Sequence, residues 1–474
     1  MKKYCASIAG RRAATLPFLF VLCAAVPAHA ASPAGWRTDG TGKYPNANPP
    51  LTWSAETNVI WKTRMPDWGN AAPAVADDRL FVCAEPATLL SVSLADGQIL
   101  WQRTNEYVDM ASPEEATTIR QAKQEAEQLS RKLHPLEGEL VTAREELKKS
   151  PENADLKQKV ETMTSQCNDL KKQLQSYEQA WYRLPATHGI NGYTSPTPVT
   201  DGKYVYVVFG TGVVACYDRD GHRKWIKLLE KPTNGWGHSA SPLLAGNRLL
   251  VHILHFHALD AATGEVLWKT RVPEHWGTSA LAHMGDDGVV VTPGGDVLRL
   301  SDGKVLASQL SPMDYSGPVV DNGVVYFIQA KGKAVKLPAA GDTNAPTVLW
   351  QTNPTNDRYY ASPICHDGLI YAIMQQGIFS VIDATNGAVV FEKKLGFGGG
   401  TVFPSICLAS NRLFVSSDNG RTIVMEPGRE PKEAVTNKIE EFRSTPVFVG
   451  SRIYIRGLRN LYCIGTTNAV PGPR

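Results

Sequence analysis

Three Trp-Gly pairs, each followed by a polar residue, are the clearest candidates for ligand binding in this 474-residue sequence. They are Trp68-Gly69-Asn70, Trp236-Gly237-His238 and Trp276-Gly277-Thr278. Side chains of similar character occupy comparable places elsewhere: Tyr193, Tyr315, Tyr359, Tyr360 and Arg443. Aromatic rings stack on sugars, peptide side chains and quinones, while Asn70 and His238 add hydrogen-bonding groups. These residues predict a ligand-binding site; the alternative is that the rings fill the centre of the fold and bind nothing.

A group of three histidines is the candidate for metal chemistry. His252, His255 and His257 lie in the segment VHILHFHALD, and on a strand His255 and His257 would share one face. No carboxylate or cysteine is evident as a further ligand, so we predict core or solvated histidines and no metal site. The glycine-rich segment GFGGGT at 396–401 precedes no helix and is predicted to be a loop. With no nucleophile elbow or His-Glu-x-x-His motif, the sequence predicts no catalytic residue.

A unit of about 42 residues recurs along the chain and must position these side chains. Each unit has an apolar run that starts at or near a proline, a glycine or asparagine turn, an alternating strand, an Asp-x-x-Gly turn and a closing aromatic residue. The unit reads SPLLAGNRLLVHI…ALDAATGEVLWKT at 241–270 and SPICHDGLIYAIMQQGIFSVIDATNGAVVFEK at 362–393. The apolar runs start at eight anchors: Pro73, Pro198, Pro242, Leu281, Pro318, Pro363, Ser405 and Pro446. The closing tryptophans are Trp61, Trp101, Trp225, Trp268 and Trp350.

These units predict an all-β, eight-bladed β-propeller with four short strands in each blade. The propeller comprises residues 58–111 and 185–465. The last unit, 444–465, has only three strands, while 58–63 (NVIWKT) resembles a fourth strand with no blade before it. We therefore expect the N-terminal strand to complete the last blade, which removes two free sheet edges.

Residues 112–184 interrupt the repeat with a helical pattern. Apolar residues step by three and four from Ile119 to Leu147 and again from Leu156 to Trp181. Ser150 is the expected N-cap of the second helix, with Pro151 in its first turn. The pattern predicts an inserted antiparallel coiled-coil hairpin. It either docks a partner, self-associates or is a solvated spike.

The ends of the chain indicate export. Residues 1–30 have a basic start, an apolar run and a small-x-small site at Ala28-His29-Ala30, as in a secretory signal peptide. Residues 31–57 form an N-terminal extension and 466–474 a flexible tail. We expect a periplasmic or secreted protein with no transmembrane segment in its mature chain. Without residues 1–30 the net charge is close to zero, which argues against nucleic-acid binding.

The repeats ALDAATGEVLWKT, SLADGQILWQR and VIDATNGAVVFEK resemble the Ala-x-Asp-x-x-Thr-Gly-x-x-x-Trp signature of the PQQ-like (pyrroloquinoline-quinone-like) β-propeller repeat family. The resemblance covers residues 36–111 and 185–465 and is specific for the fold. It implies that the closing tryptophans pack under the next blade. The family includes quinone-dependent dehydrogenases and a scaffold lipoprotein of the outer-membrane barrel-assembly machinery, so it does not by itself imply an activity.

The cysteines and acidic residues argue against a quinone cofactor. The quinone-dependent members hold PQQ with an adjacent-cysteine disulfide and a calcium ion, but this sequence has no Cys-Cys pair and no matching calcium ligands. It also lacks a Cys-x-x-Cys-His haem motif. We therefore expect no cofactor and a non-catalytic scaffold that binds a protein or glycan of the cell envelope. The alternative is a PQQ-dependent oxidoreductase, with calcium, acting on alcohols or sugars.

The cysteines that follow the signal segment fall at repeat positions typical of small buried residues. Cys216 and Cys463 share one place in the repeat, and Cys365 and Cys407 share another. We expect free buried thiols rather than a disulfide framework.

Overall fold

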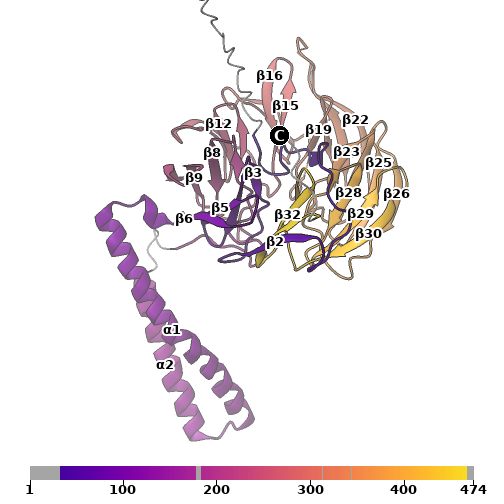
Figure 1. Cartoon of the computed structure of the whole chain (residues 1–474). Coiled ribbons are helices and arrows are strands. Elements are labelled where there is room, and N and C mark those ends of the chain that lie inside the picture. Colours follow the sequence, from indigo (N-terminus) through magenta and orange to yellow (C-terminus); the bar gives the residue numbers. More distant parts are fainter. Residues whose placement is uncertain (1–32, 178–182, 312, 343, 467–474) are drawn as a thin grey trace, which may run out of the picture. The chain divides into compact units, whose positions relative to one another are not determined.

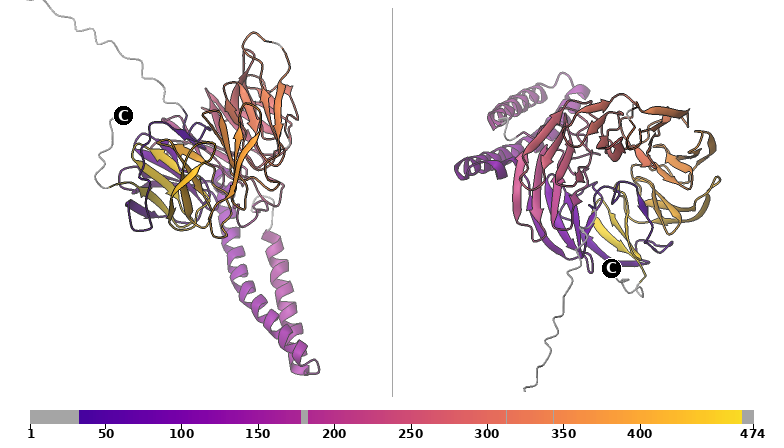
Figure 2. Two further views of the ribbon diagram at one scale, coloured as in Figure 1. Left: turned by 90° about the vertical axis from the view of Figure 1, so that its right-hand side faces the viewer. Right: turned by 90° about the horizontal axis from the view of Figure 1, so that it is seen from above.

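The computed structural model describes residues 33–177, 183–311, 313–342 and 344–466. Its β-strands form eight sheets, arranged as blades around a central axis (Figure 1 and Figure 2). This confirms the predicted eight-bladed architecture. The predicted signal peptide (1–30) and the C-terminal residues 467–474 lie outside the described residues.

Each blade contains four antiparallel strands, in chain order in the first seven blades, and its first strand lies nearest the centre, where β3, β7 and β11 contact one another in turn, as do β15, β19 and β23. The first blade consists of β3 (Ala74–Ala76), β4 (Arg79–Ala84), β5 (Thr88–Ser93) and β6 (Ile99–Thr104), and the second of β7 (Val199–Thr200), β8 (Tyr204–Val208), β9 (Val213–Asp218) and β10 (Arg223–Leu228). The third blade consists of β11 (Leu243–Ala245), β12 (Arg248–His252), β13 (Phe256–Asp260) and β14 (Val266–Thr270), and the fourth of β15 (Ala280–Met284), β16 (Asp287–Val291), β17 (Val297–Arg299) and β18 (Val305–Ala307). The fifth blade consists of β19 (Val319–Asp321), β20 (Val324–Phe327), β21 (Gly332–Lys336) and β22 (Thr347–Thr352), and the sixth of β23 (Ile364–His366), β24 (Leu369–Ile373), β25 (Ile378–Asp383) and β26 (Val389–Lys394). The seventh blade consists of β27 (Cys407–Ala409), β28 (Arg412–Ser416), β29 (Arg421–Glu426) and β30 (Lys432–Lys438), and the eighth of β31 (Val447–Val449), β32 (Arg452–Arg456), β33 (Asn460–Ile464) and β2 (Val59–Arg64).

The ring is closed by the N-terminal strand. Strand β2 pairs antiparallel with β33, with Lys62 opposite Tyr462 and Thr63 opposite Leu461. This confirms the prediction that the first strand completes the last blade. The pairing covers the outer side of β33, and β2 becomes the outermost strand of this four-stranded blade.

Residues 34–44 lie among the innermost strands of three blades. Ala34 bridges Thr200 of the second blade, and β1 (Lys43–Tyr44) pairs in parallel with β27 of the seventh. The ammonium group of Lys43 lies 3.4 Å from Asp321 on β19 of the fifth blade. Between Ala34 and β1, the fully buried Arg37 donates from Nη2 to the carbonyl of Ile406 (2.9 Å). The sequence assigned no structural role to this part of the 31–57 extension, because its partners lie hundreds of residues away.

The closing tryptophans lie between neighbouring blades. The indole nitrogens of Trp101, Trp225, Trp268 and Trp350 donate to carbonyls in the next blade, at distances of 2.7–3.0 Å. The ring of Trp225 covers Gly264, where an added Cβ would lie 2.7 Å from a ring carbon. Gly264 has φ +72°, a conformation that favours glycine, so the Asp-x-x-x-Gly turn and the tryptophan form one unit. Trp61 lies in the same way against Gly97.

Two helices separate the first and second blades in the sequence: α1 (Pro113–Lys149) and α2 (Ala154–Tyr177). They run side by side (Figure 1 and Figure 2) and share a small core: Leu133, Leu140, Ala143, Met163 and Cys167. Helix α1 starts with a capping box in which Ser112 and Glu115 satisfy each other's backbone N–H groups. Neither described helix has an apolar stretch long enough to span a membrane.

The expected start of the second helix at Ser150 is wrong. Ser150 caps the C-terminus of α1, while the side chain of Asn153 accepts a hydrogen bond from the backbone of Leu156 (3.1 Å). Asn and Ser are both good N-caps, so the choice between them depends on where the turn of residues 150–153 ends. Residues 178–182, which include the predicted seam residue Trp181, lie outside the described part.

The cysteines of the described chain are buried and unpaired: Cys83, Cys167, Cys216, Cys365, Cys407 and Cys463. This agrees with the expectation of free thiols. Burial raises the pKa of the Cys216 thiol to about 12, so it is protonated and unreactive at neutral pH.

Candidate ligand-binding site

A cavity of about 480 Å³ opens where the chain enters the innermost strands. Its lining includes seven residues that the sequence predicted: Asn70, Trp236, Trp276, Thr278, Tyr315, Tyr360 and Arg443. They come from blades far apart in the sequence, and the propeller brings them together. We call this cavity the central pocket.

One side of the central pocket is a row of aromatic rings. Trp276 stacks on Tyr315 with ring centroids 5.4 Å apart, and Tyr315 meets Tyr360 edge to face at 5.3 Å. Tyr360 then stacks on Phe403 at 5.0 Å. Because each ring belongs to a different blade, the row forms a continuous apolar wall of the kind that binds rings and flat apolar groups.

The other side of the central pocket is polar. The amide of Asn70 donates to the carbonyls of Ile190 (2.7 Å) and Asn191 (2.9 Å), while its Oδ1 is buried without a hydrogen-bond partner among the described residues. Arg443 donates to Ile190 as well (3.2 Å). An unpaired buried acceptor is costly, so Asn70 Oδ1 is the polar atom on this side that most lacks a hydrogen-bond donor.

Hydroxyl groups link neighbouring blades along two arcs of a ring at the base of the pocket, one from Ala72 to Thr278 and the other from Gly317 to Thr445. The backbone N–H of one blade donates to a serine or threonine hydroxyl of the next blade at 2.8–3.2 Å. The six links are Ala72 to Thr197, Thr197 to Ser241, Ser241 to Thr278, Gly317 to Ser362, Ser362 to Ser405, and Ser405 to Thr445. We call this chain of bonds the hydroxyl ring.

The hydroxyl ring corrects the repeat register in two blades. In most blades the ring residue directly precedes the proline anchor, as Ser362 precedes Pro363. In the fourth and seventh blades the ring residues are Thr278 and Ser405, so the equivalent anchors are the residues that follow them, not Leu281 and Ser405. These two blades lack proline at the anchor position, and the anchors predicted from the sequence were therefore wrong in both.

The other predicted site residues do not line the central pocket. His238 is buried, and burial lowers its pKa to about 4, which keeps the ring neutral. Tyr359 is buried and donates to the carbonyl of Thr355 (2.7 Å). Tyr193 donates to Pro185 (2.8 Å), and Trp68 packs against Gly192. These four side chains make contacts within the fold, and the structure does not bring them to the central pocket.

Several lining residues were missed by the sequence reasoning. Trp36 of the N-terminal segment lies against Gly317 in the hydroxyl ring, and His188 stacks on Trp236 with centroids 4.3 Å apart. Phe403 and Arg358 complete the aromatic side, with Arg358 Nη1 3.4 Å from the Tyr360 hydroxyl. None of these residues belongs to a Trp-Gly pair. Of the four, Phe403 alone has a signal in the sequence that could have identified it as a lining residue, which is its position just before an innermost strand.

The lining of the central pocket does not suit a PQQ–calcium pair. Calcium takes oxygen ligands, mainly carboxylates. The charged lining residues are Arg358 and Arg443, and no described residue of the lining is Asp or Glu. The six described cysteines are free and lie in separate elements, so they supply no adjacent disulfide. We therefore derive no redox step for this pocket.

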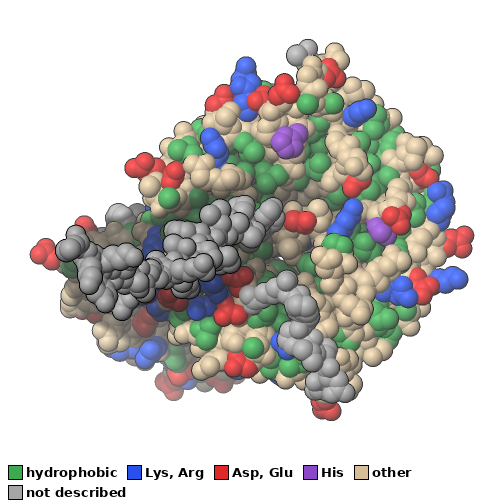
Figure 3. Space-filling model, turned by 45° about the horizontal axis from the view of Figure 1, so that its top comes forward, with side chains coloured by type: hydrophobic (Ala, Val, Ile, Leu, Met, Phe, Trp, Pro, Cys, Tyr) green, Lys and Arg blue, Asp and Glu red, His purple; other side chains and the backbone are tan. Residues whose placement is uncertain are grey.

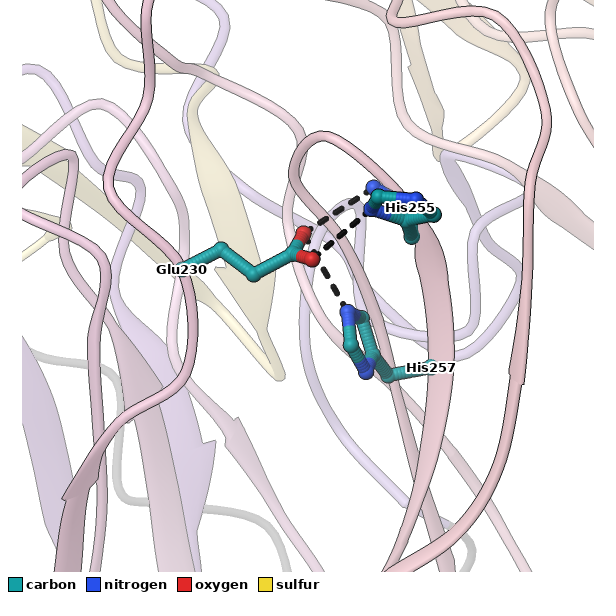
Figure 4. Close-up of side chains that lie close together, drawn as sticks. All are labelled: Glu230, His255 and His257. Atoms are coloured by element: carbon teal, nitrogen blue, oxygen red, sulfur yellow. Dashed lines mark hydrogen bonds and ion pairs between the residues drawn. The ribbon is translucent and has the colours of Figure 1, made fainter.

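The histidine cluster has a carboxylate after all. Glu230 follows β10, and its Oε1 lies 2.8 Å from His255 Nδ1, while its Oε2 lies 3.2 Å from His257 Nε2 (Figure 4). The expectation that no acidic residue is near was wrong, because Glu230 approaches from the preceding blade. His252 lies elsewhere, packed on Phe256 with centroids 5.1 Å apart.

Comparison with known proteins agrees with this architecture. The family described as "Outer membrane protein assembly factor BamB" matches residues 50–146, 170–393 and 254–468. The outer membrane protein assembly factor BamB of Yersinia pestis is 23% identical over 263 residues, which cover 49% of this chain and 64% of that protein. BamB of Moranella endobia (strain PCIT) is 21% identical over 263 residues, covering 49% and 65%. The chain thus spans less than two thirds of these relatives.

Solved structures share the fold at low identity. BamB from Moraxella catarrhalis aligns with a TM-score of 0.52 and 9% identity, covering 86% of this chain and 99% of that one. A europium-containing methanol dehydrogenase aligns with a TM-score of 0.53 and 12% identity, covering 90% of each chain. Proteins with different roles thus share this fold, and the likeness shows architecture alone. By its repeats, its eight blades and the match of the family over most of its length, the chain belongs to the BamB family of PQQ-like β-propeller repeat proteins.

Proposed function

We propose that the protein is an exported, non-catalytic scaffold of the cell envelope whose central pocket binds an extended segment of a protein partner. The observation that carries this proposal is the composition of the pocket: an aromatic row on one side, and on the other side Arg443 and an amide with an unpaired acceptor. Aromatic and arginine side chains are the groups that contribute most to protein interfaces.

The charges of the pocket favour a neutral or acidic segment. Arg358 and Arg443 bring two positive charges to a lining that has no described carboxylate. On the face in Figure 3, by contrast, acidic and basic side chains are interspersed and lie largely near the edge. Selectivity for charge is therefore a property of the pocket rather than of that whole face.

The names of the relatives suggest the setting. BamB of Yersinia pestis and of Moranella endobia are outer membrane protein assembly factors by name. We extend that role to this chain as a proposal, with a periplasmic location and partners among envelope proteins. A glycan is the alternative occupant, since aromatic rings also stack on sugars.

The helices α1 and α2 form the second element of the proposed scaffold. Their shared core of leucine, alanine, methionine and cysteine fits a coiled-coil arm, and Val141 on α1 is 57% exposed. We propose that this arm docks a partner or a second copy of the chain.

Photo-crosslinking tests the pocket. A photoreactive amino acid at Trp236, which is 56% exposed at the pocket, should crosslink an envelope protein in the native cell. Tyr360→Ala removes the centre of the aromatic row and should weaken this complex about 30-fold, the effect of losing about 2 kcal/mol at an interface hot spot. The control is Leu267→Ala on the outer strand β14, which should have no effect.

The outcomes separate the alternatives. If Tyr360→Ala and Leu267→Ala both retain the wild-type affinity, the pocket is not the docking site. A crosslinked product that is sensitive to glycosidases but not to proteases would identify a glycan instead. Deletion of 112–184 should reduce partner capture if the helices form the second contact, and unchanged capture would exclude them.

A further inference from the structure

Glu230, His255 and His257 form a compact group of three possible metal ligands. Glu230 extends from the segment after β10 in the second blade, while His255 precedes β13 and His257 lies within it in the third blade. One nitrogen from each ring and one oxygen of the carboxylate lie within 4.8 Å of one another. Figure 4 shows both imidazoles turned toward the carboxylate.

The position of Glu230 is part of the fold. Its Oε2 accepts the backbone N–H groups of Leu254 (3.1 Å) and His255 (3.0 Å). Glu440, which likewise follows the fourth strand of its blade, binds the N–H groups of Arg459 and Asn460 in the next blade in the same way. A carboxylate at this place therefore joins neighbouring blades whether or not a metal is present.

The histidines distinguish this site from the equivalent one in the last blade. Glu440 faces the amide of Asn460 and the hydroxyl of Tyr462, two residues apart on β33. Glu230 instead faces the imidazoles of His255 and His257, which have the same spacing at the start of β13. A carboxylate that already joins two blades has thus acquired two nitrogen donors.

The ring nitrogens of His257 are buried and lack hydrogen-bond partners in the described part of the chain. Its side chain is only 3% exposed, and neither ring nitrogen has a hydrogen-bond partner of good geometry among the described residues. Its Nε2 lies 3.2 Å from Glu230 Oε2. Buried polar groups are nearly always satisfied, and a metal ion between Nε2 and the carboxylate would satisfy this one.

We propose that Glu230, His255 and His257 bind a divalent transition metal ion of the zinc type, with one coordination position open to water. Two imidazoles and one carboxylate are a common donor set for zinc with an open position, whereas calcium and magnesium prefer oxygen ligands alone. Glu230 and His257 are largely buried, and His255 is 31% exposed, so solvent reaches the site from the His255 side.

Lys269 competes with the metal ion. Its ammonium group lies 2.8 Å from Glu230 Oε1, on the oxygen that also faces His255. The side chain is 45% exposed, so it can withdraw into water when a metal ion binds. Because the ligands come from two blades, the bound ion cross-links the second and third blades.

Titration calorimetry on the full chain, prepared without a polyhistidine tag and stripped with a chelator, tests the site. Zinc chloride should bind with one ion at this site, and calcium chloride should not. His255→Ala and His257→Ala should each weaken zinc binding at least tenfold. The control is His222→Ala, in an exposed group with Asp218 and Asp220, which should leave the affinity of this site unchanged. Circular dichroism verifies that each variant is folded.

A second variant tests the role of Glu230 without removing its structural bonds. Lys269→Met removes the competing charge and should tighten zinc binding several-fold. No zinc binding by the wild-type chain, or equal affinity in the wild type and both His255→Ala and His257→Ala, would overturn the proposal. An unchanged affinity in Lys269→Met would overturn the assignment of Glu230 as a ligand.

Discussion

Replacement of Ser362 by alanine should weaken the contact between the fifth and sixth blades. Ser362 Oγ accepts the backbone N–H of Gly317 at 2.8 Å, and both residues are buried. The alanine variant leaves that N–H without its partner, and an unsatisfied buried donor costs about 1–3 kcal/mol. The free energy of unfolding should fall by about that amount. Amide exchange at Gly317 should become roughly 5- to 150-fold faster if it exchanges through the affected opening.

The control for this variant comes from the hydroxyl ring itself. Threonine supplies the hydroxyl in three other blades, at Thr197, Thr278 and Thr445. Ser362→Thr therefore keeps the acceptor and should change stability much less than Ser362→Ala. Urea unfolding and hydrogen exchange by mass spectrometry measure both variants. Equal stability of the alanine variant and the wild type, or equal losses in the two variants, would refute a role for the hydroxyl ring in joining the blades.

Three further predictions concern the blades and the pocket. The ring of His238 has its pKa lowered by burial to about 4, so it stays neutral while the unfolded chain takes up a proton below pH 6.5. Stability should therefore fall with decreasing pH between 6.5 and 4, by on the order of 3 kcal/mol for this residue. His238→Gln should make the free energy of unfolding depend less on pH over this range. Identical pH profiles of stability for the variant and the wild type, measured by urea unfolding, would contradict this role of His238. In Gly264→Ala the new side chain is strained by the backbone φ of +72° and also clashes with the ring of Trp225. In Gly368→Ala the backbone φ is the same, but no atom lies near the added Cβ. The free energy of unfolding of Gly264→Ala should thus be at least about 1 kcal/mol lower than that of Gly368→Ala, as measured by urea unfolding. Equal losses of stability in the two variants would show that the Trp225 ring moves aside without cost. Trp268→Ala, which removes a buried closing indole, should cost about 3–5 kcal/mol by the same assay, and a loss below 1 kcal/mol would show that the interblade indole packs loosely.

The blade count and ring closure were predictable because their signals are local and repeated. The tryptophan–glycine units recur at a fixed spacing, and the segment 58–63 reads as a fourth strand without a blade. Much of the central pocket was predictable for the same reason: Trp276, Tyr315 and Tyr360 occupy comparable places in successive units. The propeller then brings them together without further information.

What was missed depends on contacts that no local pattern records. Arg37 and Ile406 are 369 residues apart, and Trp36 reaches the pocket from the same segment. Glu230 approaches His255 from the preceding blade and has no motif of its own. The register of Thr278 was missed because the usual proline is absent there. Strong local signals thus predicted the scaffold, and long-range pairs completed its centre.

The pairing of β2 with β33 has a consequence for biogenesis. A chain that emerges from its N-terminus makes β2 early but cannot pair it until β33 has been made, nearly four hundred residues later. Until then the growing protein is an open crescent with an unpaired strand at each end, the state in which β proteins aggregate most readily. Closure is a slow, long-range step that follows synthesis, so a protein truncated before β33 should be trapped as that crescent.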